Sequence, residues 1–202
     1  DNIPMIVFND PQIPDRTAYI LDGGNPNPLP EMTRVVLWLE RAGADFIAIP
    51  CNTAHYFYEQ IAESATVPVL NIMRETTARI VEMHGEHATI GLLATDGTLS
   101  SGVFQSYLSD AGLSVMAPSE KDQRGIVMPL IYDRVKRNLP YDPTAFLDLA
   151  RRMHENGCDA VIVGCTELSV VYQDLTHKPD YLIDSMDVLA DRCVSYYLEH
   201  HR

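Results

Sequence analysis

The chain has 202 residues, of which 46% are hydrophobic and 21% are charged, and these values are ordinary for a soluble globular protein. Its formal net charge of −13 argues against nucleic acid and anionic membrane surfaces as partners, because both bind proteins through basic patches. No apolar run approaches the roughly 20 residues of a membrane span, and four cysteines are too few for a disulfide scaffold, so we expect a cytoplasmic protein with reduced thiols.

Apolar runs alternate with helical patterns along the chain. The predicted strands are 5–8, 46–49, 69–71, 90–93, 113–116, 160–163 and 182–183. The predicted helices are 31–42, 54–63, 74–84, 99–111, 121–137, 143–156 and 186–199. Strands that alternate with helices of about 10 to 15 residues indicate βαβ units, so the predicted fold class is α/β with parallel sheets flanked by helices.

Two segments of the sequence share one pattern. Residues 43–51 and 157–165 each read as glycine, a small residue, aspartate, four apolar residues, a turn-forming residue and cysteine. Cys51 and Cys165 therefore each follow a predicted buried strand, which is where α/β proteins place chemistry. The repeat predicts two facing thiols on two related halves of the molecule.

The repeat also predicts the domain organisation. It divides the chain near residues 84–88 into two pseudo-symmetric domains, 1–86 with 186–202 and 87–185, with the active site in the cleft between them. The last helix is expected to fold back against the first half. The first half has three predicted strands against four in the second, so we expect a strand and a helix to precede Asp1.

The position of the two cysteines suits acid/base chemistry. A thiol between a strand and a helix N-terminus is expected to have a pKa below its usual value of about 8.5. Asn52, Thr53 and Thr166 follow the cysteines and can cap a helix or donate to an anion. A thiolate on one face of a carbon and a thiol on the other can invert that carbon without a cofactor.

The remaining cysteines are read differently. Free cysteine is usually an inert, buried residue, and Cys158 and Cys193 lack the context of the other two, so we expect both to be packing residues. The sequence has no CxxC and no Cys/His spacing of a zinc site, so no metal is predicted.

Two short motifs carry a resemblance to a known family. The strings CNTAH at 51–55 and GCTEL at 164–168 resemble the two signatures of the PLP-independent aspartate/glutamate racemase family. The similarity to its aspartate racemase branch extends to residues 9–17, 92–98 and 184–187, and so over nearly the whole chain. Glutamate racemases usually carry histidine where this chain has Glu167, which favours the aspartate branch.

The resemblance implies a reaction and its catalysts. The protein would interconvert L- and D-aspartate without a cofactor, with Cys51 and Cys165 as the two acid/base residues, and the family suggests a homodimer. Three residues would hold the α-carboxylate: Asn52, Thr53 and Thr166.

Two cations would complete the substrate site. The resemblance implies that Arg16 and Lys136 pair with the side-chain carboxylate of the substrate. They would supply the local positive charge that an acidic amino acid needs in an acidic protein, although each taken alone reads as a solvated surface charge.

The residues beside the cysteines suggest an unequal pair. Glu167 is expected to assist proton handling or to bind the substrate amine, and its carboxylate would raise the pKa of Cys165. Cys165 would then rest as a thiol and Cys51 as a thiolate. His55 is read either as a residue that tunes Cys51 or as a surface or packing residue.

Other readings stay open at this point. One is another reaction of the same superfamily, such as glutamate or broad-specificity racemisation, hydantoin racemisation or maleate isomerisation. Another is a catalytically inactive protein that binds an acidic amino acid. Family members begin with a strand and a Gly-Gly-Met-Gly-Pro loop that this sequence lacks, which agrees with the strand expected before Asp1.

Overall fold

A computed structural model describes residues 3–23 and 26–200 of the chain. The predicted α/β class is confirmed, and six of the seven predicted strands are present. The strands are β1 (Ile47–Ala48), β2 (Val69–Leu70), β3 (Thr89–Leu93), β4 (Ser114–Met116), β5 (Ala160–Val163) and β6 (Leu182–Asp184).

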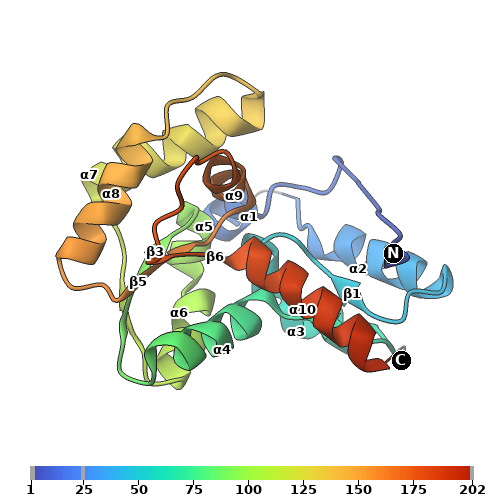
Figure 1. Ribbon diagram of the computed structural model, residues 1–202. Helices are drawn as coiled ribbons and strands as arrows, with labels where there is room; N and C mark the ends of the chain where they lie inside the picture. Colours follow the sequence, from blue (N-terminus) through green and yellow to red (C-terminus); the bar gives the residue numbers. More distant parts are fainter. Residues whose placement is uncertain (1–2, 24–25, 201–202) are drawn as a thin grey trace.

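Helices separate and flank these strands (Figure 1). The α-helices are α1 (Arg16–Asp22), α2 (Leu29–Arg41), α3 (Tyr58–Ser64), α4 (Ile72–His84), α5 (Asp96–Ser101), α6 (Val103–Asp110), α7 (Glu120–Asp122), α8 (Thr144–Glu155), α9 (Thr166–Gln173) and α10 (Ser185–His200). Four further turns are 3₁₀ or π in character: η1 (Thr53–Phe57), η2 (Gln123–Val127), η3 (Leu130–Arg134) and η4 (Val135–Arg137).

The strands form two parallel sheets. β1 pairs with β2, and the other four strands follow the order β4-β3-β5-β6. The chain moves from β3 outward to β4 and then returns to the other side of β3 to form β5. The carboxyl ends of β3 and β5 therefore flank a topological switch point, where open α/β sheets bind their ligands.

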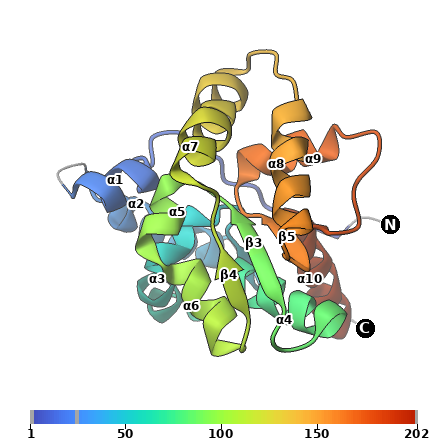
Figure 2. The same ribbon diagram turned by 90° about the vertical axis from the view of Figure 1, so that its left-hand side faces the viewer.

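Alternate residues of the central strands point to opposite faces of the larger sheet. Leu93 and Val163 pack in one buried cluster with residues of α8 and α9, such as Phe146 and Leu168. On the other face, α4, α6 and α10 cover the sheet, as the two views show (Figures 1 and 2). Both faces are buried, which is why the strands read as continuous apolar runs in the sequence.

The predicted strand at 5–8 is wrong. Residues 3–10 form no strand, and Met5 and Val7 are 78% and 77% exposed. Phe8 instead packs edge-on against Trp38 of α2, with ring centroids 4.9 Å apart. An apolar run becomes a strand only when a neighbouring strand takes up its backbone groups, and no pairing to this run is found in residues 3–23 and 26–200.

Several helix predictions also needed correction. The predicted helix 99–111 is split at Gly102, whose φ of 67° favours glycine, and the predicted helix 121–137 is broken into α, π and 3₁₀ turns. The predicted elements did not include α1 and α9. These helices have seven and eight residues, too few for hydrophobic periodicity to reveal.

The last helix, α10, packs against α4 and reaches the segment before β1 (Figure 1). Tyr196 of α10 packs against Phe46 with ring centroids 4.9 Å apart, and Arg79 of α4 pairs with Asp191 at 3.3 Å. This agrees with a final helix that folds back on the first half. The division of the chain near residues 84–88 stays a prediction, since α4 also buries Ile80 in the same cluster as Ile90 of β3.

Within the part of the chain that the structure describes, no helix combines the length and the apolar character needed to cross a membrane.

Candidate active site

One cavity of about 220 Å³ collects all eight predicted site residues. Its lining comes from the ends of both sheets, from the start of α1 and from the turns η3 and η4. The lining residues are Asp15, Arg16, Thr17, Pro50, Cys51, Asn52, Thr53, Thr95, Tyr132, Lys136, Cys165, Thr166 and Glu167. Pockets for drug-sized ligands span roughly 300–1,000 Å³, so this cavity suits a small molecule.

Cys51 enters the cavity from the end of β1. The chain leaves the strand through Pro50 in a tight turn, in which the Cys51 N–H donates to the carbonyl of Ile49 at 2.8 Å. The 3₁₀ turn η1 begins two residues later, at Thr53. The Cys51 side chain is half-buried, and its sulfur lies 3.8 Å from Nη2 of Arg16, so a cation faces this thiol.

Cys165 enters from the end of β5 and is buried, at 5% exposure. It occupies the N-cap position of α9 in an extended conformation. Gly164 before it lies against β3: a Cβ there would stand 3.0 Å from Leu92 Cδ1 and 3.1 Å from the Leu93 carbonyl oxygen. The glycine therefore lets the ends of β3 and β5 approach closely at the switch point.

The Cys165 thiol donates a hydrogen bond to Oε2 of Glu167 at 2.9 Å. Burial raises the pKa of Cys165 well above its usual range, and the neighbouring Glu167 carboxylate raises it further. The lowered pKa expected from the helix N-terminus is therefore wrong for Cys165, whereas the effect expected from Glu167 is found. Cys165 is a protonated thiol at neutral pH.

Arg16 is the first residue of α1, and its guanidinium is directed into the cavity. Nη1 donates to the carbonyls of Ile13 and Pro14 at 3.5 and 3.2 Å, which leaves Nη2 toward Cys51. Burial alone would lower the pKa of Arg16, but the Cys51 sulfur raises it on balance. The guanidinium is thus a fixed cation beside one of the two sulfurs.

Lys136 reaches the cavity from η4. Its ammonium lies 3.9 Å from the ring centroid of Tyr132 and 3.4 Å from Oδ2 of Asp15. Burial works against the charge of Lys136, but Tyr132, Glu167 and Asp15 raise its pKa on balance. The pKa of Asp15 is lowered overall, because the Ala18 N–H and Lys136 outweigh the effect of burial. In the free protein, Asp15 therefore pairs with the Lys136 ammonium that was predicted to bind substrate.

Thr53 belongs to a buried cluster of hydroxyl groups. Its Oγ1 lies 3.0 Å from that of Thr95 and 2.9 Å from that of Thr98, and Thr17 donates to Thr95 at 3.3 Å. The four threonines come from α1, η1 and the start of α5. A Cβ on Gly97 would stand 2.8 Å from the Thr17 Cα, so only glycine allows α1 this close to α5.

The sequence suggested that Asn52 and Thr166 cap helices, but neither side chain makes a capping hydrogen bond. The Thr166 hydroxyl donates to the Pro50 carbonyl at 2.8 Å. Asn52 Nδ2 donates to the hydroxyl of Ser185, which in turn donates to the carbonyl of Val163, both at 2.9 Å. Each link joins the segment around one cysteine to the other half of the site.

His55 is buried, at 2% exposure, and is not a surface residue. It does not line the cavity but contacts the backbone of Cys51.

Five lining residues were not among the predicted site residues: Asp15, Thr17, Pro50, Thr95 and Tyr132. Three of them lie in the segments 9–17 and 92–98 that carry the family resemblance. Asp15 could have been recognised, because aspartate is a common N-cap residue just before a helix. In the structure it caps α1, and its Oδ1 accepts from the Ala18 N–H at 2.8 Å. Thr95 follows the end of a predicted strand, which is also a recognisable position. Nothing local marks Tyr132, which the broken helix brings to the site.

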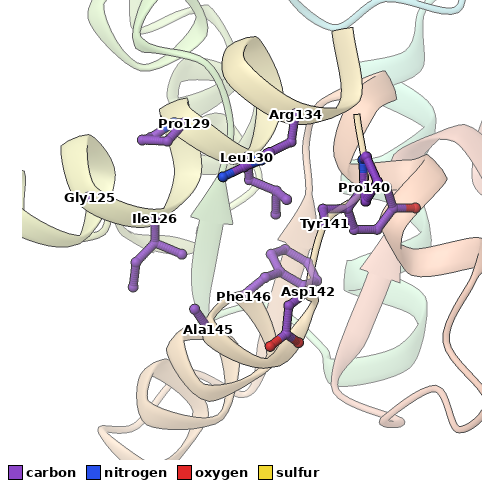
Figure 3. A pocket seen from close by; sticks show the side chains of 10 residues that line it. All are labelled: Gly125, Ile126, Pro129, Leu130, Arg134, Pro140, Tyr141, Asp142, Ala145 and Phe146. Carbon is purple, nitrogen blue, oxygen red and sulfur yellow. The ribbon is translucent and has the colours of Figure 1, made fainter. Parts of the chain in front are cut away.

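A second cavity, of about 340 Å³, lies away from the cysteines (Figure 3). Ile126 and Leu130 face Ala145 and Phe146 of α8 across it, and Arg134 and Asp142 lie at its edge. It contains no cysteine and shares no lining residue with the first cavity. The chemistry predicted from the sequence therefore belongs to the first cavity.

The other two cysteines lie in packing positions. Cys158 is 1% exposed within the core, Cys193 is half-buried against the cluster that contains α4, and all four thiols are free. Over residues 3–23 and 26–200, no three His, Cys, Asp or Glu side chains gather in a way that could hold a metal ion.

Comparison with known proteins gives a consistent result. Residues 1–193 match the sequence profile of the family described as Asp/Glu/Hydantoin racemase. The broad specificity amino-acid racemase RacX of Bacillus subtilis (strain 168) is 30% identical over 164 residues, which cover 80% of this chain and 69% of that protein. A glutamate racemase of Staphylococcus aureus (strain JH9) is 24% identical over 178 residues, covering 81% of this chain and 64% of that protein.

Among solved structures, the aspartate racemase of Picrophilus torridus superposes with a TM-score of 0.75. The two sequences are 24% identical, and the match covers 95% of this chain and 78% of that one. At this identity the likeness concerns the fold, which is that of the two-domain racemases.

Proposed function

The chain belongs to the Asp/Glu/hydantoin racemase family, and from this premise we propose that it interconverts L- and D-aspartate by proton transfer at Cα between Cys51 and Cys165. One observation carries the proposal. Two cysteines from different sheets line a single small cavity, with a guanidinium beside one sulfur and a carboxylate beside the other.

The proposed reaction needs one base and one acid at opposite faces of Cα. The Cys51 thiolate, held beside Arg16, accepts the Cα proton of one enantiomer. The Cys165 thiol, which donates to the Glu167 carboxylate in the free protein, gives its proton to the opposite face of Cα. Cys51 ends as a thiol and Cys165 as a thiolate, so protons and charge balance. The other enantiomer reacts by the reverse transfer.

Polar groups around the cysteines are suited to a dicarboxylate substrate. We assign the α-carboxylate to Asn52, Thr53 and Thr166, which all line the cavity. We assign the side-chain carboxylate to Arg16 and Lys136, the two cations in the lining. In the free protein the Lys136 ammonium lies 3.4 Å from Oδ2 of Asp15, so a substrate carboxylate that binds Lys136 would displace Asp15.

Aspartate is favoured over glutamate by Glu167, which stands where glutamate racemases usually carry histidine. The alternative is glutamate or a broader range of amino acids, and it is supported by the 30% identity to a broad specificity amino-acid racemase. A homodimer and a cytoplasmic location stay predictions. Light scattering of the purified protein would test the first.

Proton exchange in D₂O tests the function. We expect L-aspartate, incubated with the protein without PLP, to lose its Cα proton signal in NMR while D-aspartate forms. Parallel incubations with L-glutamate and neutral amino acids measure the substrate range. Loss of exchange and racemisation in both Cys51→Ala and Cys165→Ala supports the two-thiol reaction.

Cys193→Ala is the matched control, because this half-buried thiol lies outside the cavity. It is expected to racemise at the wild-type rate. Aspartate binding without any exchange would instead make the protein an inactive binder and refute the proposal.

A further inference from the structure

His55 is a buried residue that the proposed reaction does not use. It lies in η1, four residues after Cys51, and is 2% exposed. Its ring stacks on that of Tyr58, with centroids 5.8 Å apart and planes 6° apart, and the Tyr58 hydroxyl donates to the carbonyl of Val69 at 3.0 Å. The imidazole is therefore held in a fixed orientation between η1, α3 and β2.

Both ring nitrogens contact backbone groups. Nδ1 lies 2.9 Å from the carbonyl oxygen of Cys51, and the N–H of Ile72 points at Nε2 from 3.2 Å. A backbone N–H can only donate, so Nε2 is the acceptor and carries no proton. Nδ1 then carries the ring proton and donates it to Cys51. Burial lowers the pKa of His55, and its backbone hydrogen bonds do not reverse that effect, so the ring is neutral at pH 7.

The two backbone groups belong to very different parts of the molecule. Ile72 is the first residue of α4, and its N–H is one that a helix leaves without an internal partner. Asn71 takes up the next two N–H groups, of Met73 and Arg74, at 3.0 Å each. α4 is a thirteen-residue helix with five buried side chains, so it is a rigid support. The other group is the carbonyl of Cys51 itself.

The Cys51 peptide is thereby held at both ends. Its N–H donates to Ile49 within the turn, and its carbonyl accepts from His55. Any backbone rotation of this residue, which would carry the Cα–Cβ bond and the sulfur with it, would strain or break one of these bonds.

We propose that His55 is a positioning residue for Cys51: its neutral, Nδ1-protonated ring bridges the Cys51 carbonyl and the N-terminus of α4 and fixes the backbone that carries the sulfur into the cavity. The inference rests on the proposed function for its kinetic consequences, but the geometry it describes can be tested without activity.

Two substitutions separate the two ends of the bridge. In His55→Asn the side-chain NH₂ stands near the place of Nδ1 and can still donate to Cys51, while the bond to Ile72 is lost. In His55→Gln the amide oxygen stands near the place of Nε2 and can still accept from Ile72, while the donor to Cys51 is lost. Each variant lacks one hydrogen bond, so both are expected to lose similar thermal stability.

Activity is expected to follow the donor to Cys51. We expect kcat to fall about tenfold to a hundredfold in His55→Gln, because small misplacements of a reacting group are costly, with KM changed much less. We expect His55→Asn to keep kcat within about threefold, the effect of a modest hydrogen bond. Equal losses in the two variants, or losses that follow thermal stability, would overturn the proposal.

Isotope effects give a readout that general loosening does not move. With Cα-deuterated substrates, slower transfer to Cys51 raises the primary isotope effect for the enantiomer that Cys51 deprotonates. In His55→Gln this effect is expected to rise in that one direction. A rise in both directions would indicate a general loss of structure and would contradict the assignment.

Two measurements stand apart from racemisation. In wild-type protein, ¹⁵N NMR of the imidazole is expected to show a protonated Nδ1 and a bare Nε2 at pH 7, and the opposite tautomer would refute the bridge. The rate at which iodoacetamide labels Cys51, measured by mass spectrometry, is expected to differ from the wild-type rate by about fivefold or more in His55→Gln. In His55→Asn it should stay close to the wild-type rate. If the two variants differ in labelling as expected but the wild type does not racemise aspartate, the proposed function fails and the positioning role of His55 stands.

Discussion

The hydroxyl of Thr166 donates a hydrogen bond to the carbonyl oxygen of Pro50 at 2.8 Å. Thr166 follows one cysteine and Pro50 precedes the other, so a single bond ties the two thiol-bearing segments together. The chain from Asn52 through Ser185 to Val163 ties them a second time. The separation of the two sulfurs is therefore built into the backbone on both sides of the cavity.

The first prediction concerns this bond. Thr166→Val removes the hydroxyl at nearly constant volume, whereas Thr166→Ser keeps it. We expect Thr166→Val to lower kcat/KM about tenfold or more and stability by about 1 kcal/mol, since it loses one hydrogen bond and one substrate contact. Racemisation kinetics and thermal unfolding measure the two effects. A valine variant as active as the serine variant would show that the bond is dispensable.

The second prediction concerns pH and Cys165. Its pKa is raised in the folded protein, above that of an unfolded cysteine at about 8.5. Between these two values the folded state keeps a proton that the unfolded state has released. The free energy of unfolding must therefore fall as the pH rises above about 8.5, by at most about 1.4 kcal/mol per pH unit.

Chemical unfolding between pH 7 and pH 10 measures this slope. Tyrosines with raised pKa values contribute in the same direction, so the Cys165 contribution is the difference between wild type and Cys165→Ala. Glu167→Gln removes one cause of the raised pKa and leaves burial, so the slope should persist over a narrower pH range. Identical pH profiles in all three proteins would be incompatible with a raised pKa at Cys165.

The third prediction concerns the ion pair at the edge of the cavity. Asp15→Asn removes the anion beside Lys136 but keeps a residue that caps α1 well. We expect KM for L-aspartate to fall about twofold to fivefold, because a partly exposed ion pair is worth about 1 kcal/mol or less. Thermal stability and kcat should change little.

Asp15→Ala provides the comparison, because it removes both the charge and the cap. It should show the lower KM together with a loss of stability. A KM that stays constant in both variants would mean that Asp15 does not compete with substrate for Lys136.

The fourth prediction concerns the approach of α1 to α5. Gly97→Ala places a methyl group 2.8 Å from the backbone of Thr17, so α1 must shift and carry Arg16 with it. We expect a loss of about 1–3 kcal/mol in stability and a raised KM for aspartate. Gly125→Ala is the control, because its added methyl meets nothing within 4 Å. Equal effects of the two substitutions would contradict this account.

Much of the fold was accessible from the sequence because the central strands are buried on both faces. The runs at 90–93 and 160–163 have no polar residue to interrupt them, and both strands were found within one residue. The run at 5–8 looked equally apolar but has no strand beside it. Sequence shows that a segment is apolar, whereas strand formation depends on a neighbour from elsewhere in the chain.

Site residues that belong to a sequence motif were predicted, whereas those that only the tertiary structure brings to the cavity were missed. Cys51 and Cys165 follow strands, a position that the repeat reveals. Tyr132 reaches the cavity because the segment after α7 winds through π and 3₁₀ turns, a change of pitch that no local pattern announces. The partners of Asn52 and Thr166 lie more than a hundred residues away, so local capping rules gave the wrong answer.

The unequal surroundings of the two sulfurs have a consequence for the catalytic cycle. In the proposed reaction the enzyme begins with a Cys51 thiolate and a Cys165 thiol. After one conversion it is left with a Cys51 thiol and a Cys165 thiolate, so the two free forms differ only in which sulfur carries the proton. With Arg16 beside one sulfur and Glu167 beside the other, these two forms differ in energy. Before a second conversion in the same direction, a proton must return from one thiol to the other, and this reset is a step in which no substrate takes part.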